Sequence, residues 1–317
     1  MSLPALSDRS RRHLVVLLIG LAVVQAILAA LGAAALGGAI TAPTSQIALT
    51  AGIAAALALL TGLALLAERS MAERLAQSLV HDTRRSLFES VIAHAQGTRE
   101  ERWLTPFVGD LTALRNWAAR GVIRLWTSGI AALVGSIWFL WSNRDAALAL
   151  APLASGLALC LLGALRLRHI VGEQRNARGR LTRFLIRRVR AEVEGKALQG
   201  RHGRRALDSR SRALAILAEC RTRWAAMIEV AMVVAAVLAA ILLVITHRTA
   251  SATGSAELVT GLTLVAFVGS RLTEFARALH AYVAGRVAIQ RLHHLIANKQ
   301  YSNNLATFGK GKDNEEA

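Results

Sequence analysis

The sequence predicts an all-α membrane protein with six transmembrane helices and long helical extensions on one side of the membrane. Hydrophobic residues make up 54% of the 317 residues, and the mean hydropathy of +0.42 is too high for a soluble domain of this length. Six apolar segments recur along the chain, and five of them have about the 20 residues that cross roughly 30 Å of hydrocarbon. We place the spans at residues 14–40, 47–67, 121–141, 146–165, 225–246 and 258–270.

The connections between these segments alternate between short and long, and the basic residues follow that alternation. Lys and Arg number 3 in residues 1–13, 8 in 68–120, 17 in 166–224 and 7 from 271 onward. The short connections contain only Arg144 and Arg248. Because cytoplasmic loops are enriched in Lys and Arg, we expect both termini and both long connections to be cytoplasmic, in a plasma (inner) membrane protein. The net charge of +18 therefore indicates contact with the lipid bilayer rather than with nucleic acid.

Apolar residues inside the long connections recur at helical spacing. In the first connection Leu75, Leu79 and Leu87 keep an i, i+4 rhythm, and Leu181 and Leu185 do so in the second. Each long connection is therefore predicted to contain two helices that continue the flanking spans and meet at a turn. At a rise of 1.5 Å per residue, such arms project roughly 35 Å beyond the membrane.

Three local segments accompany this topology. Arg85–Phe88 lies below the second span, Phe107–Arg115 leads into the third, and Ala288–Ile296 follows the sixth. Together with the six spans and two long loops, they resemble the transmembrane domain of ABC exporters of the type I fold, over residues 14–297. Residues 1–13 are then a cytoplasmic N-terminal segment, and residues 298–317 are expected to be a polar, disordered tail.

The resemblance implies a dimer of such subunits, homo- or heteromeric, that works with a separate nucleotide-binding ATPase subunit. ATP and Mg would bind to that partner, and this chain would bind no cofactor or metal. Gly309–Lys312 lacks the spacing of a phosphate loop, so we do not expect the chain to be an enzyme. The tips of the two arms would couple the chain to the ATPase through Gln96, Thr98, Arg99, Trp103, Glu192, Glu194, Lys196 and Arg201.

Three residues inside the predicted spans are candidates for special roles. Glu229 and Arg124 are charged groups near span ends, and such groups in hydrocarbon usually face the helix bundle. For Glu229 a structural ion pair and a substrate or proton role both stay open, whereas Arg124 is expected to anchor its helix at the headgroups. Pro152 is expected to kink the fourth span.

We therefore expect the permease subunit of an ATP-driven exporter, with a hydrophobic or small amphipathic substrate. Aromatic residues make up only 5% of the chain, which favours a cavity lined by Ala, Leu, Val and Ile. One alternative is a membrane scaffold or regulator that retains the exporter fold without transporting. A secondary transporter is less favoured, because Glu229 is the one acidic residue placed clearly inside a span.

Overall fold

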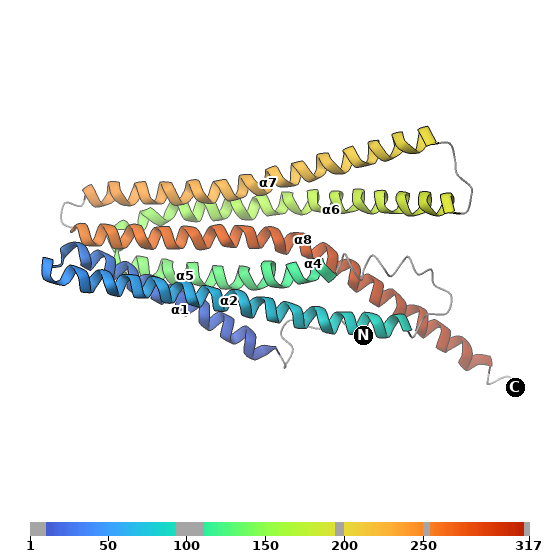
Figure 1. Ribbon diagram of the computed structural model, residues 1–317, viewed down its shortest axis with the longest axis horizontal. Helices are drawn as coiled ribbons and strands as arrows, with labels where there is room; N and C mark the ends of the chain where they lie inside the picture. Colours follow the sequence, from blue (N-terminus) through green and yellow to red (C-terminus); the bar gives the residue numbers. More distant parts are fainter. Residues whose placement is uncertain (1–10, 93–110, 194–199, 250–253, 314–317) are drawn as a thin grey trace.

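The computed structural model describes residues 11–92, 111–193, 200–249 and 254–313, and the regular structure within these ranges is helical (Figure 1). Six helices in them are long and apolar enough to cross a membrane, which is the arrangement of a multi-pass membrane protein. The elements are α1 (Arg12–Thr41), α2 (Thr44–Ile92), α4 (Leu111–Asn116), the π-helical turn η2 (Trp117–Ile123), α5 (Arg124–Ser142), the 3-10 helix η3 (Arg144–Leu150), α6 (Ala151–Val193), α7 (Gly200–Thr249) and α8 (Ser255–Asp313).

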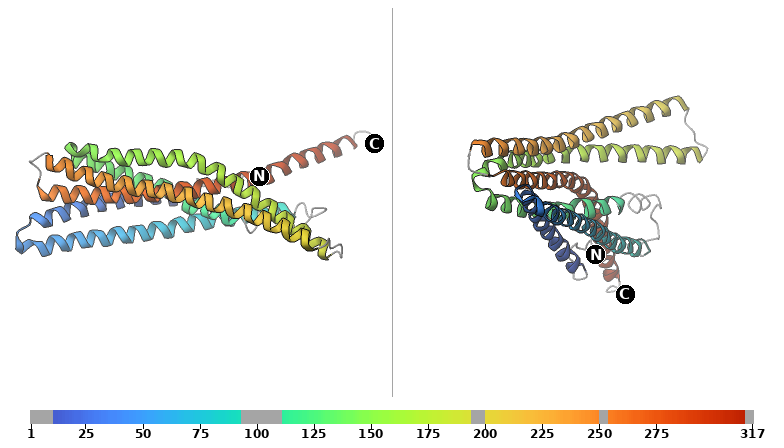
Figure 2. Two further views of the ribbon diagram at one scale, coloured as in Figure 1. Left: turned by 90° about the horizontal axis from the view of Figure 1, so that it is seen from above. Right: turned by 60° about the vertical axis from the view of Figure 1, so that its left-hand side comes forward.

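The long helices run roughly alongside one another, with the short connections at one end of the molecule (Figure 1). At the other end α6 and α7 extend beyond the apolar section as a separate arm, in which the two helices draw apart toward the tip (Figure 1; Figure 2, right). The α1–α2 turn shows how the sequence produces such a short connection. Ala42 adopts an extended conformation (φ −67°, ψ 142°) because the ring of Pro43 disfavours helix at the preceding residue.

Three helices pass without a break from the apolar section into the arms, as the periodicity predicts. Helix α2 contains 49 residues, α6 contains 43 and α7 contains 50. At 1.5 Å per residue the shortest of them is about 65 Å long, roughly twice the thickness of the hydrocarbon core. The described ranges leave out residues 93–110 of the first arm and residues 194–199 of the second arm.

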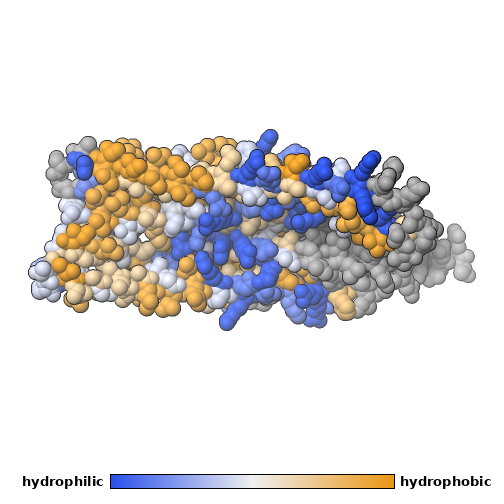
Figure 3. Space-filling view, turned by 45° about the horizontal axis from the view of Figure 1, so that its top comes forward, coloured by the Kyte–Doolittle hydropathy of each residue, from blue (hydrophilic) through white to orange (hydrophobic). Residues whose placement is uncertain are grey.

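The surface of the molecule divides into an apolar section and a polar section. Large apolar side chains are exposed over the section with the short connections, and a hydrophilic band follows it toward the arms (Figure 3). Leu59, Leu133 and Leu165 are each more than 60% exposed, as expected of side chains that face lipid. The largest interior cluster joins α1, α5, α6, α7 and α8 around Phe139, Met232, Leu243 and Leu264.

Glycines allow the closest contact between α6 and its neighbour. A Cβ atom on Gly156 would lie 2.7 Å from the Cβ of Ala235 on α7, and one on Gly163 would lie 2.9 Å from Cγ1 of Ile228. Helices in membranes associate through such small residues, because close backbone approach increases van der Waals contact. The α6–α7 pair is therefore tightly packed within the apolar section.

Two features differ from the expectations. Helix α8 continues to Asp313, through most of the segment expected to be a disordered tail, and no proline follows Pro152 in the sequence to interrupt it. Pro152 itself is the second residue of α6, at the junction with η3, rather than in the middle of a helix. A proline is tolerated in the first turn because the N–H that it lacks has no partner within the helix there.

Candidate functional site: a buried polar network

A buried glutamine in the middle of α1 begins the most unusual polar cluster of the apolar section. Gln25 is the only residue with a polar side chain between residues 14 and 40, and it is 0% exposed. It lies on the buried face of α1, on which the neighbouring residues are mainly alanines. A buried amide without hydrogen-bond partners would be strongly destabilising, so its contacts matter.

The first partner of Gln25 is a carboxylate on α2. Its Nε2 donates to Oε2 of Glu68 at 2.9 Å, and the hydroxyl of Thr127 on α5 donates to Oε1 at 2.6 Å. Both oxygens of Glu68 therefore accept a hydrogen bond, which is the pattern of a carboxylate. Glu68 is 5% exposed and Thr127 is 3% exposed, so water is excluded from these contacts.

The second partner of Gln25 is a guanidinium group on α8. Nη2 of Arg271 donates to Oε1 of Gln25 at 2.6 Å, and its Nη1 donates to Oε2 of Glu274 at 3.0 Å. The guanidinium carbon also lies 5.2 Å from the centre of the Phe267 ring. At the edge, Nη2 of Arg69 lies 3.7 Å from Oε1 of Glu274. The network thus contains two carboxylates and two guanidinium groups, a balance that buried charges require.

This network joins α1, α2, α5 and α8 at a single level. Glu68 and Arg271 lie directly after the predicted ends of the second and sixth spans, where the apolar section gives way to the arms. We name Gln25, Glu68, Thr127, Arg271 and Glu274, with Arg69 at the exposed edge, the polar network. Any sliding of one of these helices past another would separate a buried donor from its acceptor, so the network fixes their register.

The charged residues predicted within the spans lie apart from this network. Oε2 of Glu229 on α7 accepts from Nε of Arg277 on α8 at 2.9 Å, and the two side chains are 37% and 59% exposed. This contact is a structural ion pair, one of the two roles that the sequence analysis left open for Glu229. Arg124 is the first residue of α5 and is half-buried, and its carbonyl oxygen accepts from the hydroxyl of Ser128.

The predicted coupling residues lie at the ends of the arms or outside the described ranges. Glu192 lies in the last turn of α6 and Arg201 in the first turn of α7, with the side chains of both outside the description. The structure does not describe Gln96, Thr98, Arg99, Trp103, Glu194 or Lys196.

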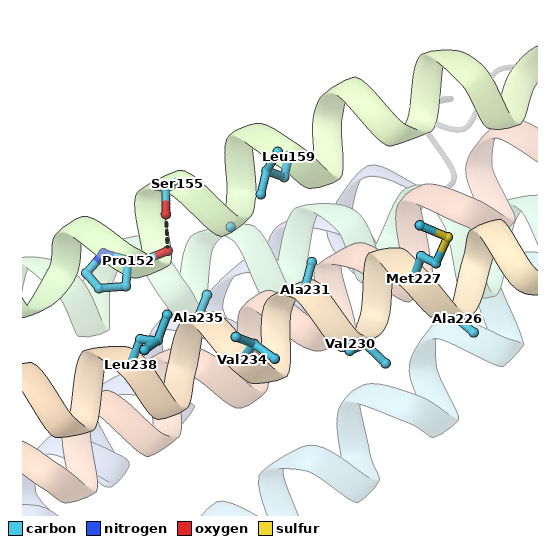
Figure 4. Close-up of a pocket in the computed structure, with 11 residues that line it drawn as sticks. Pro152, Ser155, Leu159, Ala226, Met227, Val230, Ala231, Val234, Ala235 and Leu238 are labelled. Carbon is cyan, nitrogen blue, oxygen red and sulfur yellow. Dashed lines mark hydrogen bonds between the residues drawn. The ribbon is translucent and has the colours of Figure 1, made fainter.

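An apolar groove of about 530 Å³ lies between α6 and α7 (Figure 4). Pro152 and Leu159 line it from α6, and Ala231, Val234 and Leu238 line it from α7. The hydroxyl of Ser155 donates to the carbonyl oxygen of Pro152 at 2.8 Å, which satisfies the polar side chain within its own helix. Several of its lining side chains are about half exposed, among them Val230, Val234 and Leu238, as expected of a surface that faces lipid.

The polar network was missed by reasoning from sequence because Glu68 and Arg271 stand at the ends of apolar runs, where charged residues ordinarily begin a loop. The single glutamine in residues 14–40 was the signal that could have revealed it. Comparisons of the chain with known protein families and with curated proteins give no match.

Proposed function

We propose that the chain is the membrane-spanning subunit of an ATP-driven exporter, powered by a separate ATPase subunit that binds ATP and Mg. It would act as a dimer, with both termini cytoplasmic, and would alternate access for a hydrophobic or small amphipathic substrate. The observation that carries this proposal is the continuity of α2, α6 and α7 from the apolar section into the arms. Unbroken helices transmit a displacement over their whole length, whereas a flexible loop would absorb it.

Exposed apolar side chains on the second arm support the presence of a partner. Val189 on α6 is 64% exposed and Ile216 on α7 is 66% exposed, among the exposed arginines and other polar residues of the second arm. Phe184 is covered by Arg210, with the guanidinium carbon 4.2 Å from the ring centre. Because these positions lie beyond the apolar section, a protein surface is the partner that would remove them from water.

The polar network supplies the second element that an alternating-access mechanism needs. A transporter that switches between two arrangements requires rigid groups of helices that move against each other. Buried hydrogen bonds join α1, α2, α5 and α8 into one such group. The α6–α7 pair forms the other, held together by glycine-mediated contact.

The experiment that tests this function is co-purification followed by an ATPase assay. The tagged chain is isolated from membranes, and a nucleotide-binding subunit is sought by photolabelling with an azido-ATP. If the chain is a transporter subunit, the ATPase activity of that partner in lipid will require this chain. The activity will be lost when Glu192, Glu194 and Arg201 are replaced by alanine. Arg180→Ala, a substitution of an exposed residue on α6 away from the tip, is the control and leaves the activity unchanged.

Two outcomes would contradict the proposal. The first is the absence of any nucleotide-binding subunit, which favours the alternative of a membrane scaffold. The second is a subunit whose ATP hydrolysis is the same with and without this chain.

A further inference from the structure

A second cluster of charged groups surrounds a cavity of about 270 Å³ between α4, η2, α6, α7 and α8. This volume is just below the roughly 300–1,000 Å³ of small-molecule sites, and it is enough for a compact polar group. Four arginines from three elements line it, with Gln174 and His280 beside them. They are Arg120 on η2, Arg175 and Arg178 on α6, and Arg221 on α7. We name this space the basic cavity.

Arg221 is held in place at the basic cavity by hydrogen bonds to two neighbouring side chains. Nη1 of Arg221 donates to Oε1 of Gln174 at 3.2 Å, and its Nε donates to Nε2 of His280 at 3.2 Å. Gln174 is only 9% exposed, so this guanidinium group is held by neutral acceptors in a partly dry position. At the mouth, Arg120 and Arg178 are exposed. A fixed cation at the floor and further cations at the mouth form a funnel for an anion.

The described lining of the basic cavity differs from the polar network in its charge. No carboxylate is among the residues that the structure describes as lining the cavity, in contrast to the polar network with its two acids. Arg221 and His280 lie outside the membrane spans that we assign. The pKa values of both groups are lowered, which favours their neutral forms. Burial and then the nearby Arg178 lower the pKa of Arg221. Burial and then Arg221 lower the pKa of His280, against a smaller opposite effect of Glu229.

The wall formed by η2 and α8 is held tightly in place. A Cβ atom on Gly121 would lie 2.9 Å from the backbone of Tyr282, and one on Gly285 would lie 2.2 Å from the Cβ of Trp117. These two glycines therefore allow η2 and α8 to approach almost to backbone contact. The π-helical geometry of η2 is rare and costs hydrogen-bond quality, and turns of this kind frequently occur at functional sites.

We propose that the basic cavity is an anion site that takes a phosphate group, either at the head of a phospholipid or in a small soluble molecule. Guanidinium groups recognise phosphate oxygens through paired charge-assisted hydrogen bonds, and the converging arginines offer several such donors. Basic pockets between transmembrane helices on the cytoplasmic side are suited to lipid headgroups. The proposal does not depend on transport, because it rests on the cavity alone.

The test compares two probes and three variants of the full chain. In detergent, inorganic phosphate is titrated at constant ionic strength, and its dissociation constant is obtained from the rise in Tm. In nanodiscs of phosphatidylcholine with a minority of phosphatidic acid, native mass spectrometry counts the phosphatidic acid molecules retained per chain. The variants are R178Q, R221Q and the control R223Q. Arg223 also lies on α7, but it is exposed and paired with Glu219 outside the cavity.

We expect R178Q and R221Q to weaken binding of the effective probe by about tenfold or more, as the loss of a charge-assisted hydrogen bond implies. R223Q removes the same charge and should bind as the unmodified chain does. Binding of inorganic phosphate identifies a soluble source, and retention of phosphatidic acid without phosphate binding identifies the headgroup. Equal weakening in R223Q, or no binding of either probe, would overturn the proposal. Should R221Q fail to fold, R178Q decides, because Arg178 is exposed at the mouth.

Discussion

Helices α1, α2, α5 and α8 are joined by buried and charge-balanced hydrogen bonds, whereas the α6–α7 pair meets them mainly through apolar side chains. The polar contacts described between α7 and α8 are weaker than the network. One is the part-exposed pair of Glu229 and Arg277, and the other is the bond from Arg221 to His280 at the basic cavity. In the proposed transporter, α1, α2, α5 and α8 would move as one group of helices and the α6–α7 pair would move as another.

The largest effect should come from breaking the group of α1, α2, α5 and α8. Arg271→Met removes the buried guanidinium group of the network and leaves the buried amide oxygen of Gln25 without its donor, while Glu274, which is 27% exposed, keeps Arg69 beside it. Removal of one member of a buried charged set costs about 3–5 kcal/mol. Unfolding by SDS in detergent micelles measures this free energy. Arg69→Met is the matched control, because Arg69 is 55% exposed at the rim, and it should cost under about 1 kcal/mol. Equal losses in the two variants would show that burial does not set the strength of the network.

A smaller loss is expected when the carboxylate of Glu68 is replaced by an amide of the same shape. Glu68→Gln places an NH₂ group against one of two donors, Nε2 of Gln25 or the hydroxyl of Thr127. Loss of a hydrogen bond to a charged group costs about 1.5–3 kcal/mol in the same unfolding assay. Full stability of Glu68→Gln would mean that the two contacts do not need a carboxylate.

The features of this molecule differ in how well they can be predicted from its sequence. The six spans and the arms were predictable because hydrophobic length and helical periodicity are local properties, as in Leu75 and Leu79. The polar network and the basic cavity were not, because each joins residues from separate helices. Gln25 and Arg271 are 246 positions apart, and no local pattern relates them. The arginines of the cavity were interpreted as cytoplasmic charge, and only packing shows that four of them converge.

The ion pair between Glu229 on α7 and Arg277 on α8 should contribute little to the free energy of unfolding. Both partners are part-exposed, and such pairs contribute about 0.2–1 kcal/mol, so Glu229→Gln should lower stability by less than about 1 kcal/mol. A double-mutant cycle with Arg277→Gln measures the coupling between the two side chains. In a transport assay with the partner ATPase, Glu229→Gln should retain activity, and a loss of transport with unchanged expression would instead favour a substrate or proton role.

The smallest effect on stability is expected at the mouth of the basic cavity. Arg178→Gln removes a cation that lies near Arg221, so relief of repulsion offsets the lost charge, and stability without phosphate should change by less than about 0.5 kcal/mol. The same variant should lose the stabilisation that phosphate gives, which separates a ligand site from a structural one. A stability loss as large as that of Glu68→Gln would show that Arg178 stabilises the fold itself rather than a bound ligand.

The relative movement of the two groups of helices is the central claim, and a distance measurement tests it most directly. Spin labels are placed at Arg85→Cys on α2 and Arg187→Cys on α6, both exposed, in a chain with Cys160 and Cys220 replaced by alanine. Double electron–electron resonance is recorded with the proposed partner ATPase, with and without ATP and Mg, on labelled chains diluted with unlabelled ones. A second pair, Arg187→Cys and Arg212→Cys, reports within the α6–α7 arm.

We predict that ATP shifts the Arg85–Arg187 distance by several ångströms, while the Arg187–Arg212 distance stays constant because α6 and α7 move as a unit. An Arg85–Arg187 distance that is the same in every nucleotide state would contradict the account, as would an equal change within the α6–α7 arm.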